Sequence, residues 1–220
     1  MADTLAADAK ADYQHELAEE AHATSTGISN EKLAMWIFLA SECLLFGGLI
    51  STYLLYKNRP GTIVLLEAAK GARAGSPVPI HQLYDIPFTS ISSFVLLASS
   101  LTMVFAVLAA IKHDTAKLRL WLVTTAALGM VFIGGQVYEF TVFHAEGLGF
   151  TSNVSSSAFF TLTGFHGAHV TIGILMLLSL CALTFRARPP RAEAVEIIGL
   201  YWHFVDVIWI VIFTIVYLIR

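Results

Sequence analysis

Five long apolar runs alternate with polar connections along the 220 residues of the chain. A helix needs roughly 20 consecutive apolar residues to cross the hydrocarbon core of a bilayer, and each run reaches that length. Because backbone polar groups in lipid must be satisfied within the spanning segment, the runs predict α-helices. The predicted fold class is all-α, a polytopic membrane bundle with five transmembrane helices near residues 33–57, 88–111, 118–142, 158–185 and 194–219.

Two polar segments lie outside the runs. Residues 1–30 form a polar, acidic stretch without the apolar core of a signal peptide, and we interpret them as a separate N-terminal tail preceding a five-helix domain at residues 31–220. Residues 58–87 form the one long connection, with Gly and Pro as breakers. We expect a short helix within it, at residues 63–70.

Composition supports the membrane interpretation and excludes several other classes. Hydrophobic residues make up 56% of the chain and charged residues 13%, against about 25% charged in soluble domains. A net charge of −3 without a basic cluster gives no surface for nucleic acid. Both cysteines fall in apolar runs, and the sequence holds no CxxC pair, no GxGxxG turn and no Walker-type loop.

Lysine and arginine set the expected orientation. Five spans put the N-terminal tail, the second loop and the fourth loop on one side, which collects eight basic residues, while five lie on the other side. The positive-inside rule then predicts a cytoplasmic N-terminus and an external C-terminus.

Polar side chains inside the runs are the candidate chemistry, because each is costly in lipid and requires a partner or a function. Glu42 stands in the first run. Three pairs follow in later runs, each with a spacing of three that puts both members on one helical face: Gln136 with Glu139, His166 with His169, and His203 with Asp206.

Three uses of these residues are considered. Histidines and carboxylates on facing helices could hold a metal or a haem, but the HxxH and HxxD spacings lack the ExxH repeats of di-iron bundles. Glu42 could serve an independent proton or ion transporter, yet the chain shows no inverted repeat. We favour the third use, an interhelical hydrogen-bond network without a metal.

Longer motifs carry a resemblance to a known family. The segments FFTLTGFHGAHVTIG at residues 159–173 and EIIGLYWHFVDVIWIVIFTIVYL at residues 196–218 resemble the last two helices of subunit III of haem–copper terminal oxidases. GQVYEF at residues 135–140, SSLTM at residues 99–103 and EKLAMWIFLASECLLFGGL at residues 31–49 are similar to earlier parts of the same subunit. The five spans match its short bacterial form rather than the seven-helix form.

The resemblance implies a non-catalytic subunit that stabilises subunit I and supports its proton uptake during aerobic electron transport. It implies no redox centre in this chain and haems and copper in partner subunits. Subunit I would be the main contact, with subunit II and a small subunit IV in the same complex. The electron donor would be cytochrome c, or quinol as the alternative. The resemblance also implies bound phospholipid and several residue roles.

Those roles are assigned position by position. Glu42 matches the family's membrane-embedded carboxylate. The expected structural polar network consists of Gln136, Glu139, His166, His169, Glu196, His203 and Asp206, and the expected lipid headgroup ligand is one of Arg186, Arg188 and Arg191.

Overall fold

A computed structural model describes residues 29–57, 63–65, 77–79, 86–145, 150, 154–185 and 190–218. The chain divides into two units, Met1–Glu42 and Cys43–Arg220. The predicted N-terminal tail lies almost entirely outside the described residues, as do Arg186 and Arg188.

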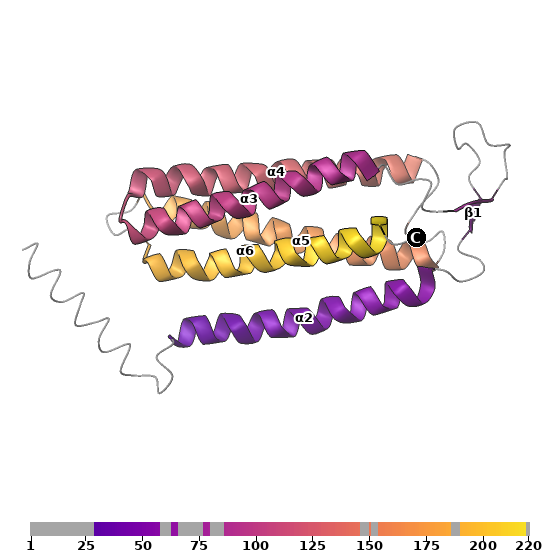
Figure 1. Cartoon of the computed structure of the whole chain (residues 1–220), viewed down its shortest axis with the longest axis horizontal. Coiled ribbons are helices and arrows are strands. Elements are labelled where there is room, and N and C mark those ends of the chain that lie inside the picture. Colours follow the sequence, from indigo (N-terminus) through magenta and orange to yellow (C-terminus); the bar gives the residue numbers. More distant parts are fainter. Residues whose placement is uncertain are drawn as a thin grey trace, which may run out of the picture. The chain divides into compact units, whose positions relative to one another are not determined.

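Five long helices account for most of the described chain (Figure 1). All five are long and apolar enough to cross a membrane, which confirms the predicted five-helix fold class. They are α2 (Asn30–Lys57), α3 (Ile86–Ile111), α4 (Thr115–Ala145), α5 (Val154–Leu183) and α6 (Ala192–Phe213), and a π-helix, η2 (Thr214–Leu218), continues α6.

The helices extend beyond the apolar runs at several ends. α5 begins at Val154 rather than near residue 158, and α4 continues to Ala145. Three serines occupy the start of α5, and the Ser157 hydroxyl donates a hydrogen bond of 2.5 Å to the backbone oxygen of Phe150. Hydroxyl groups stabilise such ends, whereas hydropathy reports only the apolar part of a helix.

α3, α4, α5 and α6 form the packed core of the second unit. α3 packs on α4 and α6, and α5 packs on the same two helices, so the four close a ring. Short connections make successive helices antiparallel neighbours. The largest side chains buried among them are aromatic or aliphatic, including Trp202, Phe132, Leu122, Leu177 and Met103.

Two tryptophans of α6 are tied to serines of α3. The Trp202 indole nitrogen donates to Ser99 Oγ at 3.0 Å, and the Trp209 nitrogen donates to Ser93 Oγ at 2.9 Å. Both indole rings are buried. Each ring therefore fills the core while its single polar atom finds a partner, as buried tryptophan requires.

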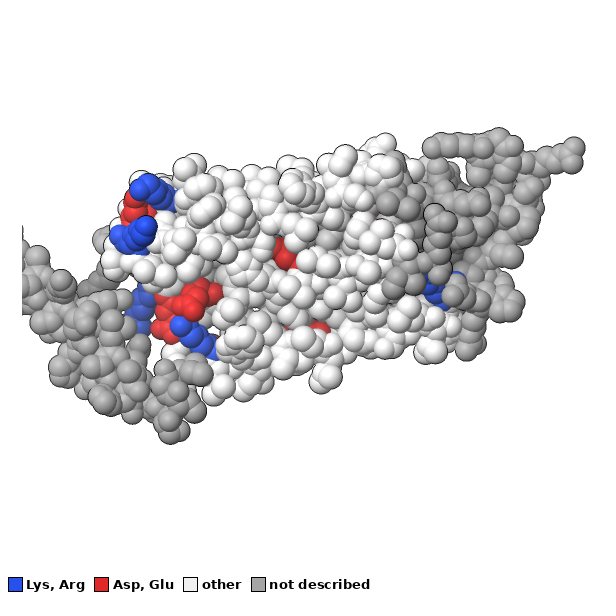
Figure 2. Space-filling model, viewed as in Figure 1, with Lys and Arg blue, Asp and Glu red and all other residues white. Residues whose placement is uncertain are grey.

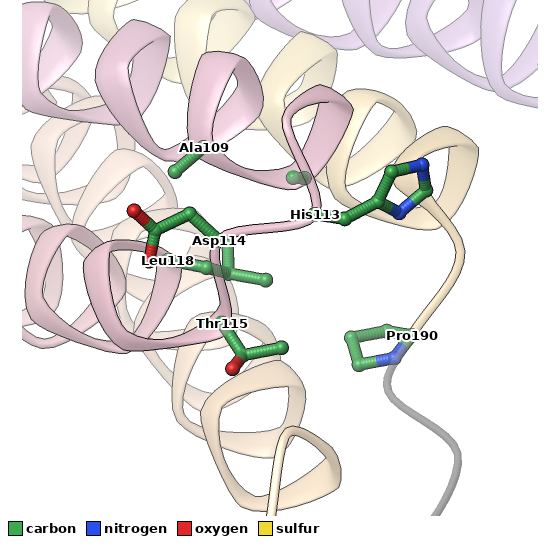
Figure 3. Close-up of a pocket in the computed structure, with 7 residues that line it drawn as sticks. Ala109, His113, Asp114, Thr115, Leu118 and Pro190 are labelled. Atoms are coloured by element: carbon green, nitrogen blue, oxygen red, sulfur yellow. The ribbon is translucent and has the colours of Figure 1, made fainter.

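The turn between α3 and α4 is tight and well bonded (Figure 3). His113 adopts a left-handed conformation with φ of 56°. Asp114 caps the start of α4, because its Oδ1 accepts a hydrogen bond of 3.1 Å from the Lys117 backbone nitrogen. A small cavity of about 40 Å³ separates this turn from Pro190, just before α6.

The long connection contains a pair of short strands. β1 (Ile63–Leu65) pairs antiparallel with β2 (Pro77–Pro79), and Ile63 stands opposite Pro79. The predicted helix at residues 63–70 is therefore wrong at its first three residues, where the β-branched Ile63 and Val64 favour extended backbone. Residues 66–70 lie outside the described part of the chain.

The surface of the described helices suits a lipid environment. The face seen in Figure 2 is almost free of charged residues between the helix ends, where lysine, arginine, aspartate and glutamate gather. Large apolar side chains are widely exposed, among them Leu44 at 80% and Phe94 at 71%. Such exposure is rare on a water-soluble monomer and normal for residues that face hydrocarbon.

Candidate functional site: polar groups inside the bundle

Glu139 joins three elements near the C-terminal end of α4. Its side chain is 6% exposed. Its Oε1 accepts a hydrogen bond of 2.9 Å from the Thr89 hydroxyl of α3 and one of 3.1 Å from the Tyr217 hydroxyl of η2. A buried carboxyl group with two hydroxyl donors ties these elements together at one point.

The π-helix that carries Tyr217 is held from a second side. Lys57, the last residue of α2, donates from Nζ to the Ile215 backbone oxygen at 2.8 Å. Its ammonium also lies 5.8 Å from the centre of the Tyr53 ring. A π-helix displaces the backbone bonding pattern by one residue, so an added donor stabilises a carbonyl where that pattern changes.

Gln136 links α4 to α5. Its Nε2 donates to the Thr163 backbone oxygen at 3.3 Å, and the residue is buried. Gly167 leaves room for this amide, because a Cβ at that position would lie 2.8 Å from Gln136 Oε1. This glycine inside the HxxH motif thus has a packing function.

His166 is an aromatic member of the core. It is fully buried and stacks on Trp209, with ring centres 4.8 Å apart and an angle of 25° between the planes. Phe132 meets its edge at 6.0 Å. Neither ring nitrogen has a hydrogen-bond partner among the described residues.

His169 stands one turn later but faces different neighbours. Its Nδ1 lies 2.8 Å from the Phe165 backbone oxygen in the same helix. Its ring meets Phe46 of α2 edge to face, with centres 5.1 Å apart. The Tyr201 hydroxyl donates to the His169 backbone oxygen at 3.0 Å and so ties α6 to α5.

His203 and Asp206 lie along the boundary between α6 and α3. His203 is partly exposed, and its Nδ1 lies 2.6 Å from the Ser100 hydroxyl oxygen. Asp206 is buried, and neither carboxyl oxygen has a hydrogen-bond partner among the described residues. Ser100 stands beside this carboxyl group and pairs with His203.

Three other predicted residues are among those that the structure describes. Glu42 is partly exposed and is the last residue of the first unit, and Glu196 is exposed near the start of α6. Arg191 is the exposed N-cap residue of α6. The hydrogen bonds described above join the predicted residues to hydroxyl groups and backbone carbonyl groups, often on a neighbouring helix.

Several partners in these contacts were missed by sequence reasoning. Thr89, Ser93, Ser99 and Ser100 are hydroxyl residues of α3 that bond to α4 or α6. Their signal was available, because hydroxyl residues recur through the start of the second apolar run. They were not predicted, because serine and threonine hydroxyls also donate hydrogen bonds to backbone oxygens of their own helix.

A further contact outside the prediction fixes one end of α5. Arg119 of α4 donates from Nε to the Thr184 hydroxyl at 2.9 Å and from its terminal nitrogen to the Thr184 backbone oxygen at 2.5 Å. The guanidinium lies over the Phe185 ring, 4.1 Å from its centre. This fork and stack close the last turn of α5 against α4.

Two features of the described residues bear on ligands. Within the described residues, no three histidine, cysteine, aspartate or glutamate side chains gather in a group that could hold a metal ion. A cavity of about 210 Å³ lies between the second half of α2 and the start of α5. Its lining is Leu49, Thr52, Tyr56, Val154, Ser157, Ala158 and Thr161.

Five membrane-length helices joined by polar contacts define a polytopic α-helical membrane protein. Residues 9–219 match the family model described as cytochrome c oxidase subunit III. The chain belongs to this family.

Named relatives include oxidases with both kinds of electron donor. The chain is 37% identical to cytochrome c oxidase subunit 3 of Bacillus sp. (strain PS3) over 91% of each chain. It is 37% identical to a probable quinol oxidase subunit 3 of Staphylococcus saprophyticus, over 86% of this chain and 88% of the relative. The identity is 34% to the cytochrome bo(3) ubiquinol oxidase subunit 3 of Pseudomonas aeruginosa, over 90% and 88%.

The chain is thus subunit III of a haem–copper terminal oxidase, and it works in a complex with other oxidase subunits. The same relatives do not distinguish the electron donor, because cytochrome c and quinol oxidases match it about equally.

Proposed function

We propose that this chain is a non-catalytic subunit that packs against subunit I, stabilises it and supports its proton uptake during aerobic electron transport. The family match over residues 9–219 is the observation that carries the proposal. The bundle supports it as well, because Gln136, Glu139 and His203 bond to neighbouring helices and build a rigid scaffold.

The redox centres of the complex belong to partner subunits in this proposal. A haem ligand needs a ring nitrogen that faces a space of porphyrin size. His166 instead stacks on Trp209 inside the packed core, and His203 Nδ1 pairs with Ser100. These contacts favour structural functions for the two histidines over ligation.

We propose that all seven predicted residues form one structural polar network. Gln136, Glu139 and His203 act through hydrogen bonds, and His166 and His169 through ring contacts. We include Asp206 and Glu196 because their segment, residues 196–218, resembles the last helix of the family. In this proposal the network fixes the helices, and subunits I and II with a small subunit IV complete the complex.

We assign the donor of the complex as cytochrome c, with quinol as the alternative. The family description and the relative from Bacillus sp. (strain PS3) favour cytochrome c. The staphylococcal and pseudomonad relatives carry the alternative, since both are named for quinol oxidases.

The chain is placed in the bacterial inner membrane, with a cytoplasmic N-terminus and a periplasmic C-terminus. The excess of lysine and arginine on the side of the α3–α4 turn supports this orientation. Proton translocation by the whole complex follows from the same assignment, with residues 1–30 as a cytoplasmic tail.

Phospholipid is the proposed ligand of this chain. The α2–α5 cavity lies between two membrane-spanning helices. Hydroxyl groups of its lining donate to backbone oxygens of their own helix, as Thr52 does to Gly48 and Thr161 does to Ser157. The lining therefore accepts an apolar chain. Glu42 is the membrane-embedded carboxylate in this proposal, and Arg186, Arg188 or Arg191 meets a lipid headgroup.

A pull-down through a tag on this chain, in mild detergent, tests the proposed function. Haem absorbance should arrive with larger oxidase subunits, and the complex should consume oxygen with reduced cytochrome c. Oxygen consumption with quinol alone would establish the alternative donor. A chain that arrives alone and colourless would favour an independent transporter, and a chain that arrives alone and coloured would make its histidines haem ligands.

A further inference from the structure

His203 presents an unusual polar group midway along α6. Its Nδ1 is fixed by the Ser100 hydroxyl at 2.6 Å. The residue is partly exposed, and among the described residues Nε2 has no hydrogen-bond partner. The ring is thus held through Nδ1, while Nε2 makes no hydrogen bond to the described residues.

Either tautomer of the neutral ring leaves a polar atom at this place. If Nδ1 accepts from Ser100, Nε2 carries a hydrogen that must be donated, and if Nδ1 donates, Nε2 carries a lone pair that must accept. Lipid hydrocarbon offers no partner for either. A polar side chain of a second membrane protein can supply that partner at mid-membrane depth, where lipid headgroups do not reach.

Three hydroxyl residues elsewhere on the helix surfaces make no such demand. Thr124, Thr171 and Ser179 donate their hydroxyls to backbone oxygens one turn earlier in the same helix. His169 is covered by Phe46 and bonds to Phe165.

The surface around His203 has the character of a helix contact. Exposed apolar side chains flank it on both helices: Leu97 and Leu101 on α3, and Val207 and Ile210 on α6. An apolar strip with one polar atom at its centre matches a membrane helix that carries one hydrogen-bonding side chain.

We propose that the α3–α6 surface centred on His203 is where another membrane-spanning subunit of the oxidase docks. A hydroxyl, amide or carboxyl side chain of that subunit bonds to His203 Nε2. This inference rests on the proposed function, because it takes its partner from the same complex.

Two amide substitutions distinguish the contribution of Nδ1 from that of Nε2. Asparagine reaches the position of Nδ1 and glutamine that of Nε2, so His203→Asn keeps the bond to Ser100 and His203→Gln keeps the outward group. Ser100→Ala removes the internal bond and leaves Nε2 in place. The measurement is haem retained per tagged chain across a series of detergent concentrations, using the full complex.

Docking through Nε2 predicts a definite order among the variants. His203→Asn should lower haem retention by about three- to twenty-fold, the range of one interhelical hydrogen bond, while His203→Gln and Ser100→Ala stay near the wild type. The reverse order, with His203→Asn unaffected and the other two weakened, would show a purely internal function and overturn the proposal.

A photoreactive residue at Val207 identifies the occupant directly. Illumination of the intact complex should give an adduct with another oxidase subunit, above the background from the same residue at Val131 on α4. An adduct with lipid alone or with a second copy of this chain would overturn the proposal. A wild-type pull-down without haem would instead remove the proposed function, and this inference with it.

Discussion

Trp202 shows how single residues set the distance between helices. A Cβ on Gly129 of α4 would lie 2.7 Å from the Trp202 ring, and one on Gly173 of α5 would lie 2.8 Å from it. Both distances are below ordinary contact, and the indole is fully buried. The two glycines thus let one ring fill the space among three helices.

Gly173→Ala should destabilise the bundle. The added methyl group must displace a rigid buried ring, and overpacking of this kind costs about 1–3 kcal/mol. Gly164→Ala is the matched control on the same helix, because no atom lies within 4 Å of its added carbon. Thermal unfolding in detergent should show a lower midpoint for the first variant and an equal or higher midpoint for the second. Equal losses in both would contradict the packing account.

Glu139 gives a second prediction at this scale. Tyr217→Phe removes one of the two hydroxyl groups that donate to its Oε1 and leaves the ring in place. The expected loss is about 1–3 kcal/mol, the cost of depriving a buried carboxyl group of a partner. Tyr138→Phe serves as the control, since Tyr138 is 60% exposed. Unchanged unfolding of Tyr217→Phe would show that the contact contributes nothing.

The helix elements owe their ends to local hydrogen bonds. Asp114 accepts from the Lys117 backbone nitrogen at the start of α4, and its second oxygen lies 2.9 Å from Lys117 Nζ. The Lys117 side chain is the main cause that lowers the pKa of the Asp114 carboxyl group below its usual value, and the Lys117 backbone nitrogen adds to this.

This shift predicts a pH dependence with a definite sign. A carboxyl group with a lowered pKa in the fold stabilises it above the unfolded pKa of about 3.9, and the effect is lost as the pH falls through the folded value. Asp114→Asn keeps the cap but loses the charge. Its unfolding midpoint should be below that of the wild type at pH 7 and converge with it at low pH. A difference that persists below pH 3 would refute this origin.

Arg119 tests the joint between two elements. Arg119→Lys loses the forked contact with Thr184 and the stack on Phe185. The free energy of unfolding should fall by about 1–2 kcal/mol. Lys112→Ala removes an exposed lysine side chain from the neighbouring turn and should change the unfolding midpoint little. Hydrogen exchange at the end of α5 would locate the loss. A uniform effect over all helices would argue against a local joint.

Sequence reasoning predicts these elements well where hydropathy decides them. Five apolar runs identified five helices, because the bilayer fixes their length. It failed at Ile63, where strand pairing with Pro79 decides the structure. Spacing put His166 and His169 on one helical face, yet Trp209 covers one and Phe46 meets the other. Which neighbour a side chain meets depends on packing between helices, and the periodicity within one helix does not predict that packing.

At the scale of the whole molecule, this is a scaffold whose polar groups face inward and whose apolar groups face outward. Buried hydrogen bonds join α3, α4, α6 and η2, while Phe94 and Leu44 remain exposed to lipid or partners. The proposed effect on the oxidase is consequently indirect. In the proposal, a rigid neighbour keeps the proton entrance of subunit I in place, and electron transfer proceeds in the subunits that hold haem and copper.

Removal of this chain from the purified oxidase tests that claim most directly. The account predicts that the stripped complex still transfers electrons to oxygen, takes up protons more slowly and loses activity earlier during turnover, and that adding the chain back restores both properties. Proton uptake and lifetime that stay the same without the chain would contradict it.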